Sequence, residues 1–294
     1  MNAPKISPPA QVRTYSPEPA LRRPMTLFRD MARDLSLSWE LALAIARRDL
    51  SALYRQSVLG YVWAFLPVLA TTGVFLFLRS GGALAKWEHP IPYPVYLLVG
   101  SLLWQVFADA VQGPLKVVTK SRAMLVKINF PRESLVLAGV LTTVFNFVVR
   151  MLILVPALVF FATRGQYEFH WSSLYAFPLG VAGIVLLGYV IGILLTPIGM
   201  LYKDVSMGIG MVLNFLMFLV PVVVALPREG MIREVMLANP ATYVVDCARG
   251  WLLGVPSELV GGFWVVVGAS LVLLMLGWLL YRISLPHVIA RLGM

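Results

Sequence analysis

Charged residues are scarce in this chain, and their scarcity excludes a water-soluble protein. Only 13% of the 294 residues are Asp, Glu, Lys or Arg, whereas 59% are hydrophobic, and the mean hydropathy is +0.82. Soluble domains carry about 25% charged residues, because the surface of a soluble fold needs polar groups. Intrinsic disorder is excluded as well, since disordered chains combine low hydrophobicity with high charge. The composition therefore predicts an integral membrane protein.

Metal-binding and catalytic patterns are also missing. The single cysteine, Cys247, allows no internal disulfide, and the three histidines are scattered without the spacing of metal ligands. The dipeptide Gly-Lys does not occur, so no phosphate-binding loop is present, and the His-Glu-x-x-His and Gly-x-Ser-x-Gly motifs are absent too. We therefore expect no catalytic residue, no metal site and no cofactor bound by this chain. ATP, if it is used, must bind to another chain.

Long uncharged segments are what the sequence has in abundance. A helix that spans a bilayer needs about 20 mostly apolar residues. Six segments meet this length: residues 56–78, 89–108, 134–163, 169–202, 205–227 and 259–281. Only Arg150 interrupts them, within the third. We predict an all-α integral membrane fold with six transmembrane helices, the second of which ends near Gln112.

The basic residues are distributed unevenly between the two sides of such a fold. With both termini on the cytoplasmic side, 17 of the 24 Lys and Arg residues fall in cytoplasmic segments and six fall in the opposite loops. Lys and Arg are retained on the cytoplasmic side of membrane proteins, which supports this orientation. The formal charge of +10 then reflects topology. Nucleic acid is not an expected partner.

The amino-terminal region divides into two parts before the first span. Six of the 20 prolines fall within the first 24 residues, so we expect residues 1–33 to be a disordered cytoplasmic tail. Apolar residues recur at spacings of three or four in residues 34–55, which predicts a basic amphipathic helix at the cytoplasmic interface. An ordinary juxtamembrane helix is the alternative. Residues 56–281 form the six-span domain, and residues 282–294 a cytoplasmic tail.

The connection between the second and third spans is basic and amphipathic. Between Gln112 and Glu133, five Lys or Arg residues alternate with apolar residues, and Pro131 ends the pattern. This pattern predicts a short cytoplasmic helix. The helix is either a simple positively charged loop or a docking surface for a cytoplasmic partner.

The connection between the fifth and sixth spans is long for an outer loop. Residues 227–258 contain apolar stretches that are too short to span, separated at Asn239-Pro240, which predicts re-entrant or interfacial helices. Asp246 and Arg249 are three residues apart, so a helix would bring them together as a structural ion pair. A contact with substrate is the alternative for this pair.

Arg150 is the one charge deep inside a predicted span. Charged side chains in the membrane are costly and face other protein groups or a water-filled path. Asp109 is the obvious partner, but it lies only a few residues from the predicted inner end of its span. Arg150 lies about 25 Å from the inner end of the third span, at 1.5 Å per residue. We therefore expect the two residues not to pair, and Arg150 to snorkel outward or to line a pore.

Several short motifs together resemble ABC-2 type permeases, in the branch that exports polysaccharides such as O-antigen, capsule-like glycans or teichoic acids. They occur in order across residues 40–282. The motifs are Arg48-Asp49-Leu50, Tyr54-Arg55-Gln56-Ser57-Val58-Leu59-Gly60, Trp63-Ala64, Leu125-Val126-Lys127, Phe130-Pro131-Arg132-Glu133, Leu201-Tyr202-Lys203-Asp204-Val205 and Asn239-Pro240. Lys203 stands where the family usually has arginine.

The resemblance implies a permease subunit of an ABC exporter, and not an enzyme. It implies a homodimer of permease chains in the bacterial inner membrane, surrounded by membrane lipid, with two ATPase subunits that bind ATP and Mg²⁺. The implied substrate is a polyprenyl-linked glycan. Two alternatives remain: an ABC-2 permease for a smaller substrate such as a drug, lipid or modified oligosaccharide, and a membrane enzyme that acts on lipid-linked sugars.

The resemblance also implies roles for particular residues. The coupling helix that docks on the ATPase would comprise Leu115, Lys116, Lys120, Met124, Leu125, Lys127, Phe130 and Pro131. The gate helix would attract the lipid pyrophosphate through Arg47, Arg48, Tyr54 and Arg55. Candidates for the pore lining are Trp63, Phe65, Trp104, Phe107 and Arg150, because aromatic faces suit sugar rings. The outer re-entrant loop would include Asn239, Pro240, Asp246 and Arg249.

Overall fold

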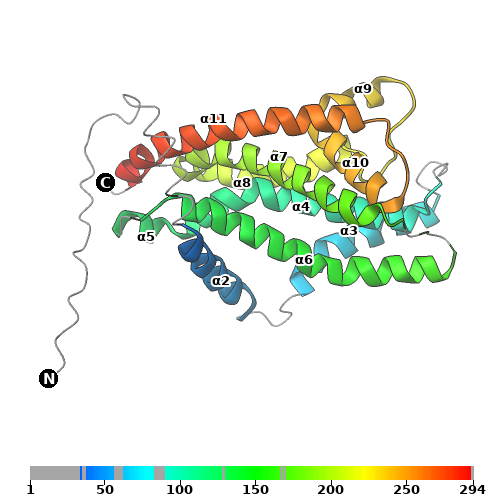
Figure 1. Ribbon diagram of the computed structural model, residues 1–294, viewed down its shortest axis with the longest axis horizontal. Helices are drawn as coiled ribbons and strands as arrows, with labels where there is room; N and C mark the ends of the chain where they lie inside the picture. The colour runs from blue at the N-terminus through cyan, green and yellow to red at the C-terminus, as the bar shows by residue number, and fades with distance from the viewer. Residues whose placement is uncertain are drawn as a thin grey trace.

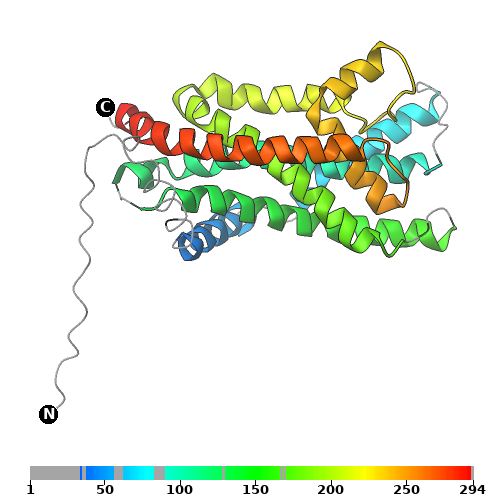
Figure 2. The same cartoon turned by 45° about the horizontal axis from the view of Figure 1, so that its top comes forward.

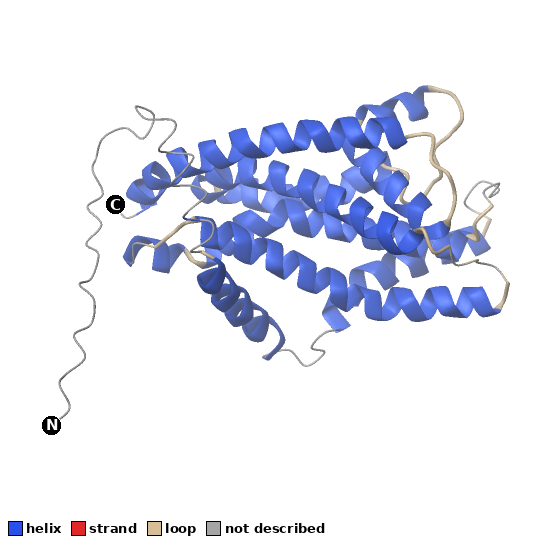
Figure 3. Ribbon diagram, viewed as in Figure 1, coloured by secondary structure: helices blue, strands red, loops and turns tan. Residues whose placement is uncertain are grey.

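The computed structural model describes residues 34, 38–55, 62–82, 90–127, 130–165, 168 and 170–292. In this part of the chain the regular elements are helices and no strand is present (Figure 3). In chain order they are α2 (Trp39–Arg55), α3 (Val62–Ser80), α4 (Tyr93–Lys120), α5 (Arg122–Lys127), α6 (Glu133–Thr163), α7 (Ser173–Leu201), α8 (Lys203–Leu216), η2 (Met217–Leu219), α9 (Met231–Ala238), α10 (Pro240–Leu253) and α11 (Val260–Leu292). The proline-rich segment 1–33 lies outside the described residues.

Helix α4 occupies the centre of the bundle. Its side chains are buried along most of its length, and it packs against α3, α6, α7 and α10. By contrast, α6 and α11 expose many apolar side chains, as helices do when one side faces lipid. The long helices lie roughly side by side in an elongated bundle (Figure 1).

Small residues allow α7 to approach α4 closely. A Cβ atom on Gly188 would lie 2.6 Å from the Cβ atom of Ala110 and 3.0 Å from the carbonyl oxygen of Phe107. Helices in a membrane associate through such close backbone contacts, since burial of apolar surface drives association only weakly there. The glycine therefore fixes the distance between α4 and α7, the two most buried of the helices long and apolar enough to cross a membrane.

We predict that Gly188→Ala lowers the free energy of unfolding by about 1–3 kcal/mol, because the new methyl group forces α7 away from α4. Gly73→Ala on α3 is the matched control, since a Cβ atom there has no neighbour within 4 Å. The control should be neutral or stabilising by about 1 kcal/mol at most. Reversible unfolding in mixed detergent micelles measures both changes. Equal effects of the two variants would contradict the prediction.

Four described helices are long and apolar enough to cross a membrane: α4, α6, α7 and α11. The first predicted span, residues 56–78, overlaps the shorter apolar stretch Phe65–Ser80 of α3, and residues 56–61 lie outside the described part. The fifth predicted span, residues 205–227, is not one continuous helix. It comprises α8, with 14 residues, then η2 and a non-helical segment.

Pro221 explains why α8 stops short. Proline lacks a backbone amide hydrogen, and it disfavours helical geometry in the residue before it. Val220 accordingly has an extended backbone with φ −131° and ψ 147°. Charge counts could not reveal this break, because the whole segment is uncharged.

Helix α4 is longer than the sequence predicted. It continues past Gln112 and through Pro114 to Lys120, and a break at Ser121 separates it from the short helix α5. The predicted cytoplasmic helix between Gln112 and Glu133 is therefore divided into the last turns of α4, α5 and a loop. Leu115 and Val118 are buried, and this packing extends α4 where composition alone indicated a boundary.

The same end of the bundle contains α2, α5, the start of α6 and the end of α11 (Figures 1 and 2). Helix α11 continues to Leu292, through most of the segment that we expected as a tail. Helices α9 and α10 lie at the opposite end. The described parts of the segments predicted to be cytoplasmic thus lie at one end of the molecule.

Candidate functional site

Helix α2 lies through one face against the end of the bundle that contains α5. Ala42, Ile45 and Ala46 are buried there at the spacing of successive helical turns, together with Asp49. They pack with apolar residues of α4, α5, α6 and α11 in a separate core cluster. Arg47 and Arg48 lie on the exposed side of α2. The side chains of Tyr54 and Arg55 lie outside the described part of the structure.

Asp49 connects α2 with the end of α4. Its Oδ1 lies 3.4 Å from Nζ of Lys120 and 2.9 Å from an Nη atom of the neighbouring Arg48. Asp49 is 7% exposed, so its carboxylate needs these cations. The sequence analysis named Asp49 only within the motif Arg48-Asp49-Leu50 and did not predict its contact with Lys120. Asp49 is an acidic residue at the helical spacing of the buried face of α2. This position in the sequence could have indicated that its carboxylate contacts a cation of another helix.

Arg282 of α11 connects Asp34, which precedes α2, with the start of α6. One Nη atom lies 2.9 Å from Oδ2 of Asp34, and the other lies 2.9 Å from Oε1 of Glu133. Glu133 is buried, and the neighbouring Tyr281 is buried too, with its hydroxyl donating to the carbonyl oxygen of Arg132 at 3.5 Å. Two ion-pair groups, centred on Asp49 and Arg282, therefore hold α2 against three other helices.

The predicted coupling residues divide into anchors and exposed side chains. Leu115 and Leu125 are buried in the same core as the inner face of α2, so they fix the segment in place. Met124, Phe130 and Pro131 are partly buried. The lysines Lys116, Lys120 and Lys127 are exposed at the end of the molecule, where a partner protein would meet them.

We predict that Arg282→Ala loosens α2, because Asp34 and Glu133 lose their shared cation. With Cys247 replaced by alanine, a new cysteine at Ala46 reports this, since Ala46 is 3% exposed. A partly exposed ion pair contributes about 1 kcal/mol to stability. Its removal should raise the population in which α2 opens and exposes residue 46, and so raise the rate of maleimide labelling about fivefold.

Arg291→Ala on the same helix is the control for this labelling experiment, because Arg291 is exposed. It should leave the labelling rate unchanged. Labelling that is equally slow in the Arg282→Ala variant would show that the ion pairs do not hold α2 in place.

In the interior of the bundle, Arg150 pairs with Asp109. An Nη atom of Arg150 lies 2.8 Å from Oδ2 of Asp109, and the Asn146 amide donates to the same oxygen at 3.3 Å. The side chain of Arg150 is 6% exposed. The expectation that these residues do not pair is therefore wrong, and so is that of outward snorkelling. The lining of a pore by Arg150 stays a prediction.

Two features bring the pair to a common depth. Helix α4 extends to Lys120, which places Asp109 well inside the bundle. In addition, long side chains of a helix lean toward its amino terminus. Helices α4 and α6 are antiparallel, so Asp109 and Arg150 lean toward each other.

The opposite end of the bundle, where α10 lies, holds a second buried ion pair. An Nη atom of Arg249 lies 2.6 Å from Oδ1 of Asp246, and both residues belong to α10. The sequence predicted this structural ion pair. The Arg249 guanidinium also stacks 3.7 Å from the ring centre of Tyr96 and donates to the carbonyl oxygen of Pro221. The Ser257 hydroxyl donates to Asp246 at 2.7 Å. These contacts join α10 to α4 and to the segment that follows η2.

Helix α10 begins and ends where the sequence provides the appropriate caps. The Asn239 side chain accepts a hydrogen bond from the backbone amide of Ala241 at 3.0 Å, and Pro240 occupies the first helical position. Gly254 ends the helix with φ +69°, in the left-handed region. The predicted break at Asn239-Pro240 thus separates α9 from α10.

The aromatic candidates for the pore lining differ in their exposure. Trp104 and Phe107 are 1% and 4% exposed and contact one another inside the core, so in this structure neither faces a path outside the chain. Trp63 of α3 is 56% exposed, and Phe65 lies beside Arg150 at a small cavity. Of these four aromatics, only Trp63 presents a largely open surface.

A known protein family and several known proteins are similar to this chain over most of its length. The model of the ABC-2 type transporter family matches residues 40–253, which comprise most of the chain. The chain is 27% identical to the O-antigen export system permease protein RfbA of Myxococcus xanthus over 216 residues, which cover 71% of this chain and 79% of that protein. It is also 21% and 22% identical to two proteins of the same name from Klebsiella pneumoniae, over 66% of this chain and 73% of each relative.

The family match runs from Glu40 in α2 to Leu253 at the end of α10, and it includes the pairs Asp49–Lys120, Asp109–Arg150 and Asp246–Arg249. Asp34 and Arg282 lie outside the matched residues. This chain belongs to the ABC-2 type transporter family.

Proposed function

We propose that this chain is the membrane subunit of an ABC exporter that moves a lipid-linked polysaccharide out of the bacterial cytoplasm. The observation that carries the proposal is the likeness to O-antigen export permeases over about two thirds of the chain or more. ATP hydrolysis would take place on separate ATPase subunits. The chain would lie in the inner membrane with both termini in the cytoplasm, and with α3 and the α8 region completing six passes.

The exposed basic residues of the cytoplasmic end would perform two tasks. Arg47 and Arg48 on α2, together with Arg55, would attract the pyrophosphate of the carrier lipid at the membrane surface. The last turns of α4 and helix α5 would dock on the ATPase through Lys116, Lys120 and Lys127. Because Lys120 also pairs with Asp49, a movement of the docking segment would reach α2 directly.

A second copy of the chain would complete the transport path. The described interior of one chain is a packed apolar core with buried ion pairs, and Trp104 and Phe107 belong to that core. A polar glycan needs a hydrated path, so the path would form between two chains. Trp63 is a candidate for its wall because it is largely exposed.

Co-expression with a candidate ATPase subunit tests the assembly. We expect a stable complex of two permease and two ATPase chains, with a copurifying glycolipid identified by mass spectrometry. A complex that carries a small molecule instead would favour the smaller-substrate alternative. A chain that never associates with an ATPase would contradict the proposal.

The gate residues can be tested in the same complex. Simultaneous Arg47→Ala, Arg48→Ala and Arg55→Ala substitutions should lower glycan-stimulated ATPase activity about tenfold, since charged contacts with phosphate are lost. Basal ATPase activity should persist. Arg228→Ala is a control, because Arg228 is exposed in the loop before α9, at the opposite end of the bundle. Unchanged stimulation in the triple variant would exclude this role for the basic face of α2.

A further inference from the structure

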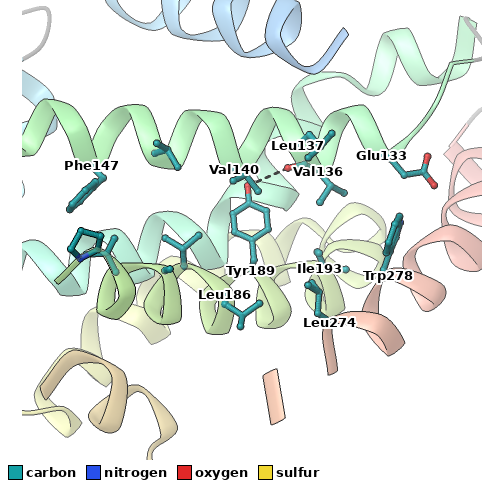
Figure 4. Close-up of a pocket in the computed structure, with 15 residues that line it drawn as sticks. Glu133, Val136, Leu137, Val140, Phe147, Leu186, Tyr189, Ile193, Leu274 and Trp278 are labelled. Carbon is teal, nitrogen blue, oxygen red and sulfur yellow. Dashed lines mark hydrogen bonds between the residues drawn. The ribbon is translucent and has the colours of Figure 1, made fainter. Parts of the chain in front are cut away.

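A large groove runs along the outside of the bundle between α6, α7 and α11. Its volume is about 550 Å³. Figure 4 shows Phe147 at one end, Glu133 and Trp278 at the other, and Tyr189 between them. The lining residues are Glu133, Val136, Leu137, Val140, Val144, Phe147, Pro178, Val181, Ala182, Val185, Leu186, Tyr189, Ile193, Leu274 and Trp278. The wall is therefore apolar along its length and carries one carboxylate at one end.

The groove follows from the way in which the helices pack. Helices α6 and α7 both pack closely against α4, but they contact each other at few points. Helix α11 packs against the other side of α7. Small residues of α7, such as Ala182, leave the space between α6 and α11 open. The Tyr189 hydroxyl does not add a free polar group to the wall, because it bonds to the carbonyl oxygen of Val136 at 3.5 Å.

The surroundings of the groove determine what can fill it. All three lining helices are long and apolar enough to cross a membrane, so the groove opens toward lipid hydrocarbon. Its volume lies within the range of ligand sites, which is roughly 300–1,000 Å³. An elongated apolar groove in that position accepts a hydrocarbon chain.

The charges at the cytoplasmic end select the headgroup. Glu133 shares Arg282 with Asp34, so the three side chains together carry a net charge of −1. Such a group attracts a cationic amine and repels a second anion. Arg132, the residue before Glu133, adds a positive charge at the same end of α6, and a positive charge there favours a phosphate nearby. Opposite charges on neighbouring residues match a zwitterion better than a pyrophosphate.

We propose that this groove binds one membrane phospholipid with an amine-bearing zwitterionic headgroup, of the phosphatidylethanolamine type. One acyl chain lies along α7 between Phe147 and Trp278, and the ammonium group contacts Glu133. The site is separate from the gate residues on α2, and it does not depend on which substrate the protein exports.

Photo-crosslinking tests the site directly. The full-length chain is reconstituted in vesicles of phosphatidylethanolamine and phosphatidylglycerol that contain a phosphatidylethanolamine probe with a diazirine on its acyl chain. We expect crosslinks to concentrate on the groove-facing residues of α6, α7 and α11. Excess phosphatidylethanolamine should compete, and phosphatidylglycerol should not. Equal competition by phosphatidylglycerol would overturn the headgroup assignment.

Other occupants give different results in the same experiment. Crosslinks spread evenly over every lipid-facing helix would show only a general lipid shell, and would overturn the site. Stronger competition by a polyprenyl diphosphate than by phosphatidylethanolamine would show that the groove holds a carrier lipid. Crosslinks lost whenever two chains associate would show that a second copy covers the groove. Each of these outcomes contradicts the proposal.

Two variants separate the tail from the headgroup. Ala182→Trp fills the groove from an exposed position and should abolish the specific crosslinks, whereas Ala269→Trp, at an exposed position of α11 outside the groove, should leave them unchanged. Glu133→Gln should weaken competition by phosphatidylethanolamine about tenfold, through loss of a charged contact. Crosslinks that survive Ala182→Trp would overturn the proposal even if Glu133→Gln proved unstable.

Discussion

Replacing Arg249 by methionine should lower the free energy of unfolding by about 3–5 kcal/mol, the usual cost of removing one partner from a buried ion pair. The guanidinium is buried and contacts Asp246, the Tyr96 ring and the carbonyl oxygen of Pro221 at once. Methionine fills much of the same volume but provides no positive charge. Asp246 would then remain with the Ser257 hydroxyl as its described partner. Unfolding in mixed detergent micelles measures the loss.

A matched control is available on α9. Arg233 also pairs with a carboxylate, that of Glu258, but at 3.8 Å and with the glutamate side chain 88% exposed. Exposed pairs contribute about 0–1 kcal/mol, so Arg233→Met should change stability little. The double variant Asp246→Leu with Arg249→Met should recover most of the loss, because it leaves no charge without a partner. Equal effects of Arg249→Met and Arg233→Met would contradict this account.

The sequence predicted the elements that depend on local signals. The spacing of apolar residues such as Ala42, Ala46 and Leu50 indicated the amphipathic helix. Asn239-Pro240 marked the boundary at which α10 begins. The pair Asp246–Arg249 followed from its spacing of three residues. In each case the information lies within one or two turns of a helix, so no tertiary structure was needed.

The wrong predictions concern features that depend on contacts between distant segments. Composition cannot show that α4 continues to Lys120, because burial of Leu115 and Val118 against α2 and its neighbours decides it. The contacts of Arg282 join it with Asp34 and Glu133, which are 248 and 149 residues away. Only the three-dimensional packing of the helices shows that these residues contact each other. The groove between α6, α7 and α11 likewise has no signature in any one segment.

Replacing Asp109 by leucine should lower the free energy of unfolding by about 3–5 kcal/mol. The substitution leaves the Arg150 guanidinium, 6% exposed, inside the bundle with no carboxylate. The Asn146 amide cannot compensate, because it is neutral. Arginine in the interior of a membrane protein needs an anion or water, and α3 and α4 enclose this position on the side of Phe65 and Leu102. Unfolding in mixed micelles again provides the measurement.

The double variant Asp109→Leu with Arg150→Met distinguishes two causes of the loss of stability in Asp109→Leu. One is the charge of Arg150 left without a partner, and the other is poor packing around the new leucine. If the pair only stabilises the fold, removing both charges should restore stability to within about 1 kcal/mol of the native chain, because desolvation of the charges offsets most of their attraction. A double variant as unstable as Asp109→Leu alone would instead show that packing around leucine, and not the uncompensated charge, causes the loss. The side chains of Asp109 and Arg150 point toward each other from α4 and α6. We therefore expect the unpaired charge, and not the packing, to cause most of the loss of stability.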